Sequence, residues 1–146
     1  MDDCIIFDID GTLSDNSKRL HFIKRKDRTK DWKSYHSMIY TDKPIIPMVL
    51  IYRIIHRAIP IVIFTGRFES SRYITNKWFT EYNIPFPFKM LMRSDGDYTT
   101  NEELKRRMLM NLKRSWNPIL AIDDNDNVID MFLSEKVLCL KCLSQF

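Results

Sequence analysis

The stretch CIIFDIDGTL at residues 4–13 decides the fold that this sequence predicts. Its apolar run, Cys4–Phe7, is typical of a strand that is buried on both faces of a parallel sheet. Asp8 and Asp10 follow at once, and Gly11 then permits a turn because a glycine has no Cβ atom to restrict its backbone. Ligands of open α/β sheets bind just beyond the carboxyl ends of such strands, so both carboxylates are candidate functional residues.

Further apolar runs predict the other strands of the same sheet at Ile61–Phe64, Ile119–Ile122 and Val137–Leu140, with a weaker candidate at Phe88–Met92. Helical patterns alternate with these strands at Met48–Ala58, Ser70–Tyr82, Asn101–Ser115 and Asn127–Leu133. Such alternation implies parallel strands joined by crossover helices. We therefore expect an α/β fold, a Rossmann-like three-layer sandwich with a mostly parallel five-stranded sheet. Counted along the chain, the strand order should be 3-2-1-4-5, with the Asp8 strand central.

The composition is that of an ordinary globular chain. Its 146 residues are 45% apolar and 29% charged, and this length favours a single domain over residues 1–146. No apolar stretch is long enough to span a membrane, and the acidic start MDDC is unlike a secretory signal. The odd number of cysteines, three, argues against a disulfide framework and favours the cytoplasm.

Two local patterns carry structural expectations. Cys139 and Cys142 have the CxxC spacing of zinc and redox sites, but their strand-like segment would place them on opposite faces. Buried structural thiols are the simpler interpretation. The predicted helix Met48–Ala58 is apolar almost all round, so we expect it to be buried.

The positive charge of the chain is local. The formal net charge is +4, but residues 18–33 hold eight Lys and Arg against two Asp, so the rest of the chain is slightly acidic. Trp32, Tyr35 and His36 lie within or beside this segment. Aromatic side chains among cations suit the stacking of exposed bases beside phosphates. The alternative is a small helix whose Trp packs on the domain while its cations face water. The three histidines show no relation to the carboxylate motifs.

Polar residues follow two more predicted strands and should meet the first pair of carboxylates at one edge of the sheet. Thr65 and Gly66 end one strand, and Asp123 and Asp124 end another. Crowded carboxylates repel one another unless a cation lies among them, and hard oxygen ligands favour Mg²⁺. The Thr65 hydroxyl and the Gly66 amide could hold phosphate oxygens, and Lys105 could neutralise further negative charge.

The ordered motifs FDIDGT, IVIFTGR, a lysine and ILAIDD resemble those of the haloacid-dehalogenase superfamily of aspartate-nucleophile phosphatases. The resemblance implies that Asp8 is the nucleophile and that Asp10 is first general acid and then general base. It also implies that Mg²⁺ is held by Asp8, the Asp10 carbonyl and Asp123, with Asp124 close by. The expected catalytic residues are therefore Asp8, Asp10, Thr65 and Lys105.

A narrower resemblance concerns RLHFI, KDWKSYH, KMLMRSDGDY and IDDNDNVIDMF, which are similar to segments in the phosphatase half of phage polynucleotide kinase/3′-phosphatases. It implies that Arg67 and Arg93 contact the substrate, with Gly66 and Asp97 beside them. Two positions depart from that pattern, because Asn101 stands where Asp is usual and Asn125 where Arg is usual.

Together these observations predict a Mg²⁺-dependent phosphatase that removes 3′-phosphates from DNA or RNA ends, in a host cytoplasm if the source is a phage. A small basic insertion, about residues 14–46, should replace a large cap. The alternatives are a nucleotidase or small-metabolite phosphatase and a non-catalytic nucleic-acid-binding module. No GxxxxGK[ST] loop occurs, so no kinase half is expected.

Overall fold

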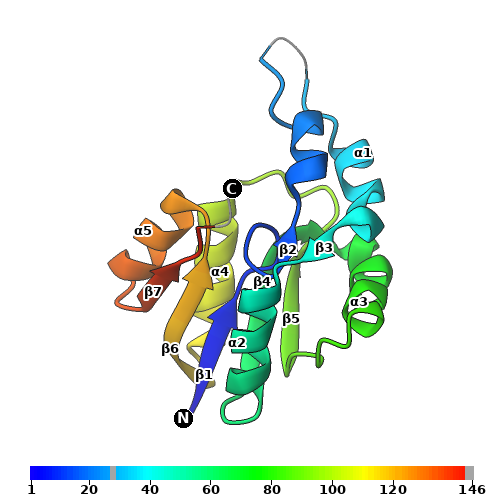
Figure 1. The fold of residues 1–146 in the computed structure, drawn as a ribbon. Coiled ribbons are helices and arrows are strands. Elements are labelled where there is room, and N and C mark those ends of the chain that lie inside the picture. Colours follow the sequence, from blue (N-terminus) through cyan, green and yellow to red (C-terminus); the bar gives the residue numbers. More distant parts are fainter. Residues whose placement is uncertain (27–28, 144–146) are drawn as a thin grey trace.

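A five-stranded parallel sheet forms the centre of the computed structural model, which describes residues 1–26 and 29–143 (Figure 1). Its strands lie in the order β5 (Lys89–Arg93), β4 (Ile61–Phe68), β1 (Asp2–Phe7), β6 (Trp116–Asp123) and β7 (Leu138–Lys141). Every neighbouring pair is parallel. The predicted strand order and the central place of the Asp8 strand are therefore confirmed.

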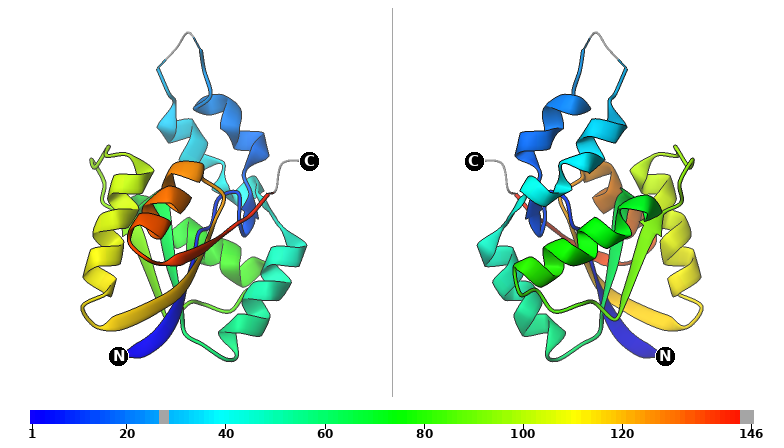
Figure 2. Two further views of the ribbon diagram at one scale, coloured as in Figure 1. Left: turned by 90° about the vertical axis from the view of Figure 1, so that its left-hand side faces the viewer. Right: turned by 90° about the vertical axis from the view of Figure 1, so that its right-hand side faces the viewer.

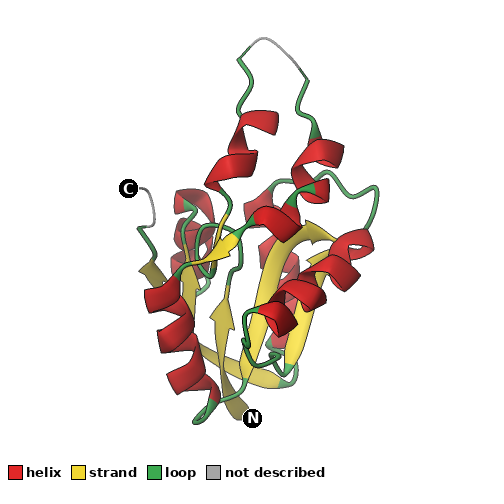
Figure 3. Ribbon diagram, turned by 45° about the vertical axis from the view of Figure 1, so that its right-hand side comes forward, coloured by secondary structure: helices red, strands yellow, loops and turns green. Residues whose placement is uncertain are grey.

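Helices cover both faces of this sheet (Figures 2 and 3). One face carries α2 (Ile46–His56) and α3 (Arg72–Glu81), and the other carries α4 (Asn101–Leu112) and α5 (Asp126–Ser134). Successive side chains of β1 point to opposite faces, so Phe7 enters the first core and Ile6 the second. The three-layer α/β sandwich is as predicted from the alternation of strands and helices.

The helix α2 is only half buried, and the expectation of a fully buried helix is wrong. Val49 and Tyr52 face the sheet and are 2% and 0% exposed. Leu50 and Ile54 point away from it and are 51% and 69% exposed. A helix that lies on one face of a sheet buries a single stripe of side chains, and among the described residues no further layer covers the outer side of α2.

Between β1 and α2 the chain rises above the carboxyl edge of the sheet (Figure 1). A two-stranded antiparallel ribbon, β2 (Ser14–Asp15) with β3 (Lys43–Pro44), forms the base of this excursion. The 3₁₀ helices η1 (Ser17–Phe22) and η2 (Ile39–Thr41) and the helix α1 (Trp32–Ser37) lie between the two strands. We call residues 14–44 the insertion. Arg28, one of the eight basic residues of the 18–33 segment, lies outside the described residues.

The structure also shows the state of the cysteines and the lengths of the helices. Cys4 and Cys142 are buried, Cys139 is half-buried, and all three thiols are free. Across residues 1–26 and 29–143, none of the helices has the length and apolar character needed to cross a membrane.

Candidate active site

Three carboxylates gather at the carboxyl edge of the sheet, as the sequence predicted for residues at the ends of parallel strands. Asp8 follows β1, Asp123 ends β6, and Asp124 comes directly after it. Each offers an oxygen atom within 4.8 Å of the others. Asp8 and Asp123 are buried and Asp124 is half-buried. We call these three residues and Lys105 the acidic cluster.

Lys105 reaches this cluster from α4. The helix begins where the Thr100 hydroxyl accepts a hydrogen bond from the Glu103 amide, at 3.4 Å, as an N-terminal capping residue does. Lys105 lies in the next turn and is buried. Its Nζ donates to Asp8 Oδ1 at 2.8 Å and to Asp123 Oδ2 at 2.6 Å. One ammonium group therefore bridges two of the three carboxylates.

The acidic cluster has a surplus of negative charge. Burial and the adjacent Asp123 carboxylate raise the pKa of Asp8 well above its usual range, although Lys105 opposes the shift. Burial and Asp123 likewise raise the pKa of Asp124. Burial disfavours the charged form of Lys105, but Asp123 and Asp8 outweigh it and raise the lysine pKa. The cluster thus has the charge and the hard oxygen donors that fit a divalent cation such as Mg²⁺.

The turn after β1 brings the chain against this cluster. Gly11 has a φ of +80°, a conformation that other residues adopt at a cost. A Cβ atom there would lie 2.1 Å from Asp124 Oδ2, so any side chain would displace this carboxylate. The following Thr12 is buried and its hydroxyl donates to Asp8 Oδ2 at 3.4 Å. Both the positive φ and the close approach of Asp124 therefore favour glycine at position 11.

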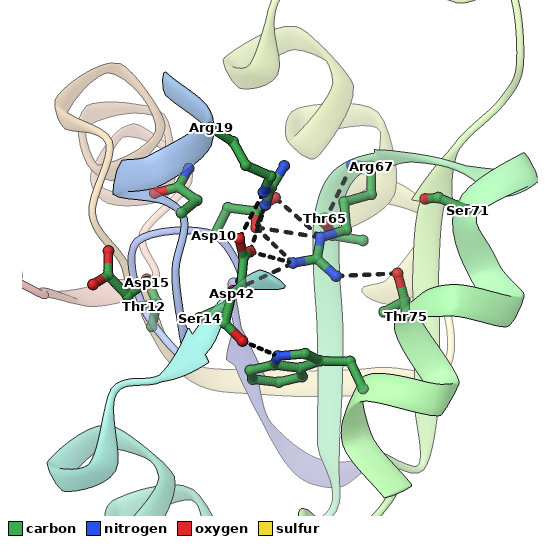
Figure 4. Close-up of polar contacts among 12 residues, drawn as sticks. Asp10, Thr12, Ser14, Asp15, Arg19, Asp42, Thr65, Arg67, Ser71 and Thr75 are labelled. Atoms are coloured by element: carbon green, nitrogen blue, oxygen red, sulfur yellow. Dashed lines mark hydrogen bonds and ion pairs between the residues drawn. The ribbon is translucent and has the colours of Figure 1, made fainter. Parts of the chain in front are cut away.

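Asp10, two residues after Asp8, belongs to a second group of charges, which Figure 4 shows. Its Oδ1 accepts from Arg67 Nη2 at 2.6 Å and from Arg19 Nη2 at 2.8 Å. Asp42, from the insertion, accepts from Arg19 Nε and Nη2 at 2.7 and 2.6 Å, and lies 3.5 Å from Arg67 Nη2. Both guanidinium groups and Asp42 are fully buried as side chains. We call these four residues the paired cluster.

The paired cluster keeps Asp10 ionised. Burial alone would raise the pKa of this carboxyl group, but the ion pairs and hydrogen bonds with Arg67 and then Arg19 outweigh it and hold the pKa far below its usual range. Ser14 donates to Asp42 at 2.6 Å, and Arg67 donates to the Thr75 hydroxyl at 3.1 Å. The insertion, β4 and α3 therefore meet at the paired cluster.

The TGR triplet lies near the end of β4, which continues to Phe68 and is longer than predicted. Thr65 is buried, and its hydroxyl accepts from the Arg67 amide at 3.2 Å. A Cβ atom on Gly66 would lie 2.7 Å from Asn101 Oδ1, so any larger residue here would displace the Asn101 side chain. The structure thus places Thr65 and Gly66 on the strand next to Asp8, at the same edge of the sheet.

Arg93 is buried and holds backbone around the site. It donates to the carbonyl oxygens of Gly66, Asp97 and Thr99 and to Asn101 Oδ1, over 2.6–3.1 Å. Asn101, the position that departs from the phage pattern, therefore accepts a hydrogen bond from Arg93 through its side-chain oxygen.

The carboxylate of Asp97 bonds to the surrounding loop and α4. It accepts from the amide and hydroxyl of Thr99 and from Arg107 Nη2. These hydrogen bonds lower its pKa to about 2. The predicted substrate residues Arg93 and Asp97 thus both shape the loop between β5 and α4.

Three residues near the site were not singled out as site residues from the sequence. Arg19 was counted only among the basic residues of the 18–33 segment, Asp42 carried no signal, and His36 was judged unrelated to the carboxylates. His36 nevertheless contacts the ring of Tyr35, which in turn lies 4.2 Å from the Arg19 guanidinium carbon of the paired cluster. The nine-residue spacing from Asp10 to Arg19 is not a periodicity of any element, so sequence patterns alone could not reveal their contact.

Comparison with known proteins identifies the family. The sequence profile of the polynucleotide kinase PNKP phosphatase domain matches residues 2–145. The chain belongs to this family. It is therefore a haloacid-dehalogenase-like phosphatase domain of the PNKP type, and the resemblance expected from its motifs is confirmed. No match was found among curated protein sequences.

Solved structures share the fold of this chain. Two chains from structures of the Pnkp1/Rnl/Hen1 complex, one of them described as an RNA repair complex, superpose with TM-scores of 0.77 and 0.79 at 21% identity. Each match covers 97% of this chain, which spans 42% and 45% of the length of those chains. A haloacid-dehalogenase-like hydrolase from Streptococcus pneumoniae has a TM-score of 0.68 at 16% identity, over 94% of this chain and 83% of its own.

Proposed function

We propose that this protein is a Mg²⁺-dependent phosphatase that uses Asp8 as nucleophile and removes 3′-phosphates from polynucleotide ends. The observation that carries the proposal is the placement of two carboxylates with opposite environments at one sheet edge. Asp8 lies in the acidic cluster with a surplus of negative charge, whereas Asp10 is held by two guanidinium groups. Family membership supports the phosphatase chemistry of this pair.

In the proposed first step, an Asp8 carboxylate oxygen attacks phosphorus and the bond from phosphorus to the ester oxygen breaks. Lys105 holds Asp8 in place through its 2.8 Å hydrogen bond, and the buried Thr12 hydroxyl contacts the other oxygen. Thr65 and the Gly66 amide are the proposed donors to the non-bridging oxygens. The leaving oxygen takes a proton from Asp10, which yields the alcohol and an aspartyl-phosphate.

In the second step, a water molecule attacks the aspartyl-phosphate while Asp10 takes the proton, which releases phosphate and restores Asp8. The ionised Asp10 of the free protein is already in the form that this step needs. The protonated form needed for the first step would arise as the anionic phosphate competes for Arg19 and Arg67. Arg93 and Asp97 are proposed to act around the substrate through the loop that they hold.

The acidic cluster is the proposed metal site. Asp8, Asp123 and Asp124 would hold Mg²⁺ through carboxylate oxygens, with the Asp10 carbonyl as a further ligand. Bound there, the ion would neutralise the surplus charge and polarise the phosphoryl group. The residues fit such an ion because their oxygens already converge and their mutual repulsion needs a counter-charge.

The insertion supports a polynucleotide substrate. Lys24, Lys26, Lys30 and Lys33 are exposed on the excursion that rises above the site (Figure 1). Cations in this position would contact the phosphates that precede the terminal one. The named relatives, which include chains of an RNA repair complex, point to the same class of substrate.

The decisive experiment compares oligonucleotides phosphorylated at the 3′ end, the same sequences phosphorylated at the 5′ end, and free mononucleotides, all with Mg²⁺. We expect phosphate release from the 3′-phosphorylated oligonucleotide, falling steeply with added salt because each phosphate contact releases counterions. Preference for mononucleotides with little salt dependence would overturn the polynucleotide claim and favour a nucleotidase. Absence of turnover on all of these phosphate esters would overturn the proposal that the protein is a phosphatase.

A further inference from the structure

A wall of aromatic side chains stands beside the proposed phosphatase site. His36 stacks on Trp32 with ring centroids 6.1 Å apart, and its edge meets Phe68 at 5.0 Å. Phe68 in turn meets Tyr98 at 5.9 Å. These rings come from α1 of the insertion, the end of β4 and the loop before α4. The wall thus joins three segments that are far apart in sequence, and Tyr98 at its end is 75% exposed.

His36 is the unusual member of this wall. Both of its ring nitrogens are buried, and they are the only buried side-chain polar atoms without a hydrogen-bond partner among the described residues. Burial lowers the pKa of His36 to about 4, with Asp10 opposing the shift and Arg19 adding to it. At neutral pH the ring therefore carries one N–H donor and one acceptor, and neither is used.

Packing alone does not explain a histidine at this position. A phenylalanine would keep the ring contacts with Trp32, Tyr35 and Phe68 without burying two unbonded nitrogens. Buried polar groups in folded proteins almost always have partners, because burying them unpaired opposes folding. His36 contacts the ring of Tyr35, which lies against the Arg19 guanidinium group that binds Asp10, so the missing partner would arrive with a substrate bound at this edge of the sheet.

Tyr35 contrasts with His36 within the same helix. Its hydroxyl accepts a hydrogen bond from Asn16 at 2.8 Å, and its ring lies 4.2 Å from the Arg19 guanidinium carbon. Tyr35 is buried and its polar atom is engaged, so it belongs to the support of the paired cluster. Of the aromatic residues noted in the sequence, the structure therefore leaves Trp32 and His36 for a ligand.

We propose that this wall is the binding site for the terminal nucleotide of the substrate, whose base stacks on Tyr98 and Phe68 and uncovers the His36 ring, so that one of its nitrogens hydrogen-bonds to the same nucleotide. Stacking suits a polynucleotide end because every base has an aromatic face, whatever the sequence. The Lys30 ammonium group lies 5.7 Å from the Trp32 ring, so cations continue the surface toward the next phosphates. This inference rests on the proposed polynucleotide phosphatase function. It names the terminal base as the part of the substrate that the enzyme recognises beside the phosphate.

The test measures how protein variants bind modified substrates. All variants are made in the Asp8→Asn protein, which should bind the substrate without turning it over. One oligonucleotide carries a normal 3′-phosphorylated terminal nucleotide, the second lacks only the terminal base, and the third ends in a 3′-hydroxyl. Fluorescence anisotropy gives the dissociation constants. Loss of the base should weaken binding roughly tenfold, as expected for one stacked base.

Tyr98→Ala and His36→Phe, each added to Asp8→Asn, should weaken binding of the normal oligonucleotide by a similar factor. Removing the base should then matter little in the Tyr98→Ala protein, because the stacking partner is already gone. The matched control is His21→Phe, which changes an exposed histidine of the same insertion. It should leave the dissociation constants of all three oligonucleotides unchanged. His36→Phe should melt no lower than its parent, since it removes two buried unbonded nitrogens.

The outcomes separate this inference from the function on which it rests. If removal of the base weakens every variant as much as the parent, the wall does not bind the base and the inference is overturned. If the parent binds the 3′-phosphate and 3′-hydroxyl oligonucleotides equally, the proposed function fails and the inference with it. Tyr98→Ala keeps the test valid even if His36→Phe unfolds, because Tyr98 is mostly exposed.

Discussion

The acidic cluster and the paired cluster lie side by side but are built on opposite principles. The first sets three carboxylates against one ammonium group, Lys105, and raises the pKa of Asp8. The second sets two carboxylates against two guanidinium groups and lowers the pKa of Asp10. Two aspartates separated by one residue therefore have opposite tendencies to hold a proton.

This difference shows how one sheet edge separates two chemical roles. A charge surplus is unstable by itself and invites a cation, whereas a balanced and buried set of ion pairs is complete and rigid. The proposed nucleophile lies where a cation would bind, and the proposed acid/base residue lies where the protein itself supplies the counter-charges. The predictions below test each half of this contrast.

The largest effect is expected from Asp8→Asn. The amide keeps the shape of the side chain but is a poor nucleophile, so phosphate release should fall at least about 1000-fold. The fold should persist, as judged by an unchanged or higher melting temperature. Turnover within a few-fold of the original protein would show that Asp8 is not the nucleophile.

Arg19→Met should break the paired cluster. It leaves the buried Asp42 without its main partner, and removing one member of a buried ion pair typically costs about 3–5 kcal/mol of stability. Urea unfolding measures this loss. The neighbouring Lys18→Met, on an exposed side chain, should stay within about 0.5 kcal/mol of the original protein. Equal stability of both variants would mean that the buried network contributes nothing.

Mg²⁺ should stabilise the protein through the acidic cluster. A ligand that binds only the folded state at 100 times its dissociation constant adds about 2.7 kcal/mol, so the melting temperature should rise with Mg²⁺ and fall with a chelator. Asp123→Asn should remove most of this response. Asp126→Asn, at an exposed carboxylate three residues along, should retain it. A response of equal size in both variants would place the metal elsewhere.

The two clusters should also have opposite pH dependences in metal-free buffer, because each unit of pKa shift changes the stability by about 1.4 kcal/mol. The pKa of Asp10 is lowered by folding, so its contribution is present above the unfolded value of about 4 and is lost as the pH falls toward the folded value. The pKa of Asp8 is raised, so ionising it opposes folding increasingly as the pH climbs above about 4.

Chemical unfolding at several pH values between 3 and 8 compares the two substitutions. Asp10→Asn should destabilise most near neutral pH and less in acid. Asp8→Asn should stabilise most at the alkaline end of the range and least in acid. Parallel curves for the two variants would contradict the contrast between the clusters.

The meeting of Asp8, Asp123 and Lys105 could be predicted from the sequence. Runs of Ile and Val predict buried parallel strands, and the carboxyl ends of such strands share one edge. The capping residues at Thr100 set the start of α4 and hence the register of Lys105. These inferences need only local patterns and one topological rule, so they hold before any contact is known.

The burial of Arg19, by contrast, could not be predicted, since it stands in a run of similar basic residues of which most face water. Its contacts with Asp10 and Asp42 join residues 9 and 23 positions apart across an irregular insertion. The same holds for His36 and for the exposed side of α2. The sequence by itself determined the strand order, the sheet edge and the acidic cluster, because periodicity and strand ends are local properties and one topological rule orders parallel strands. Only the tertiary structure decided which cation is buried and which nitrogens lack a partner, because desolvation depends on everything that packs around a group.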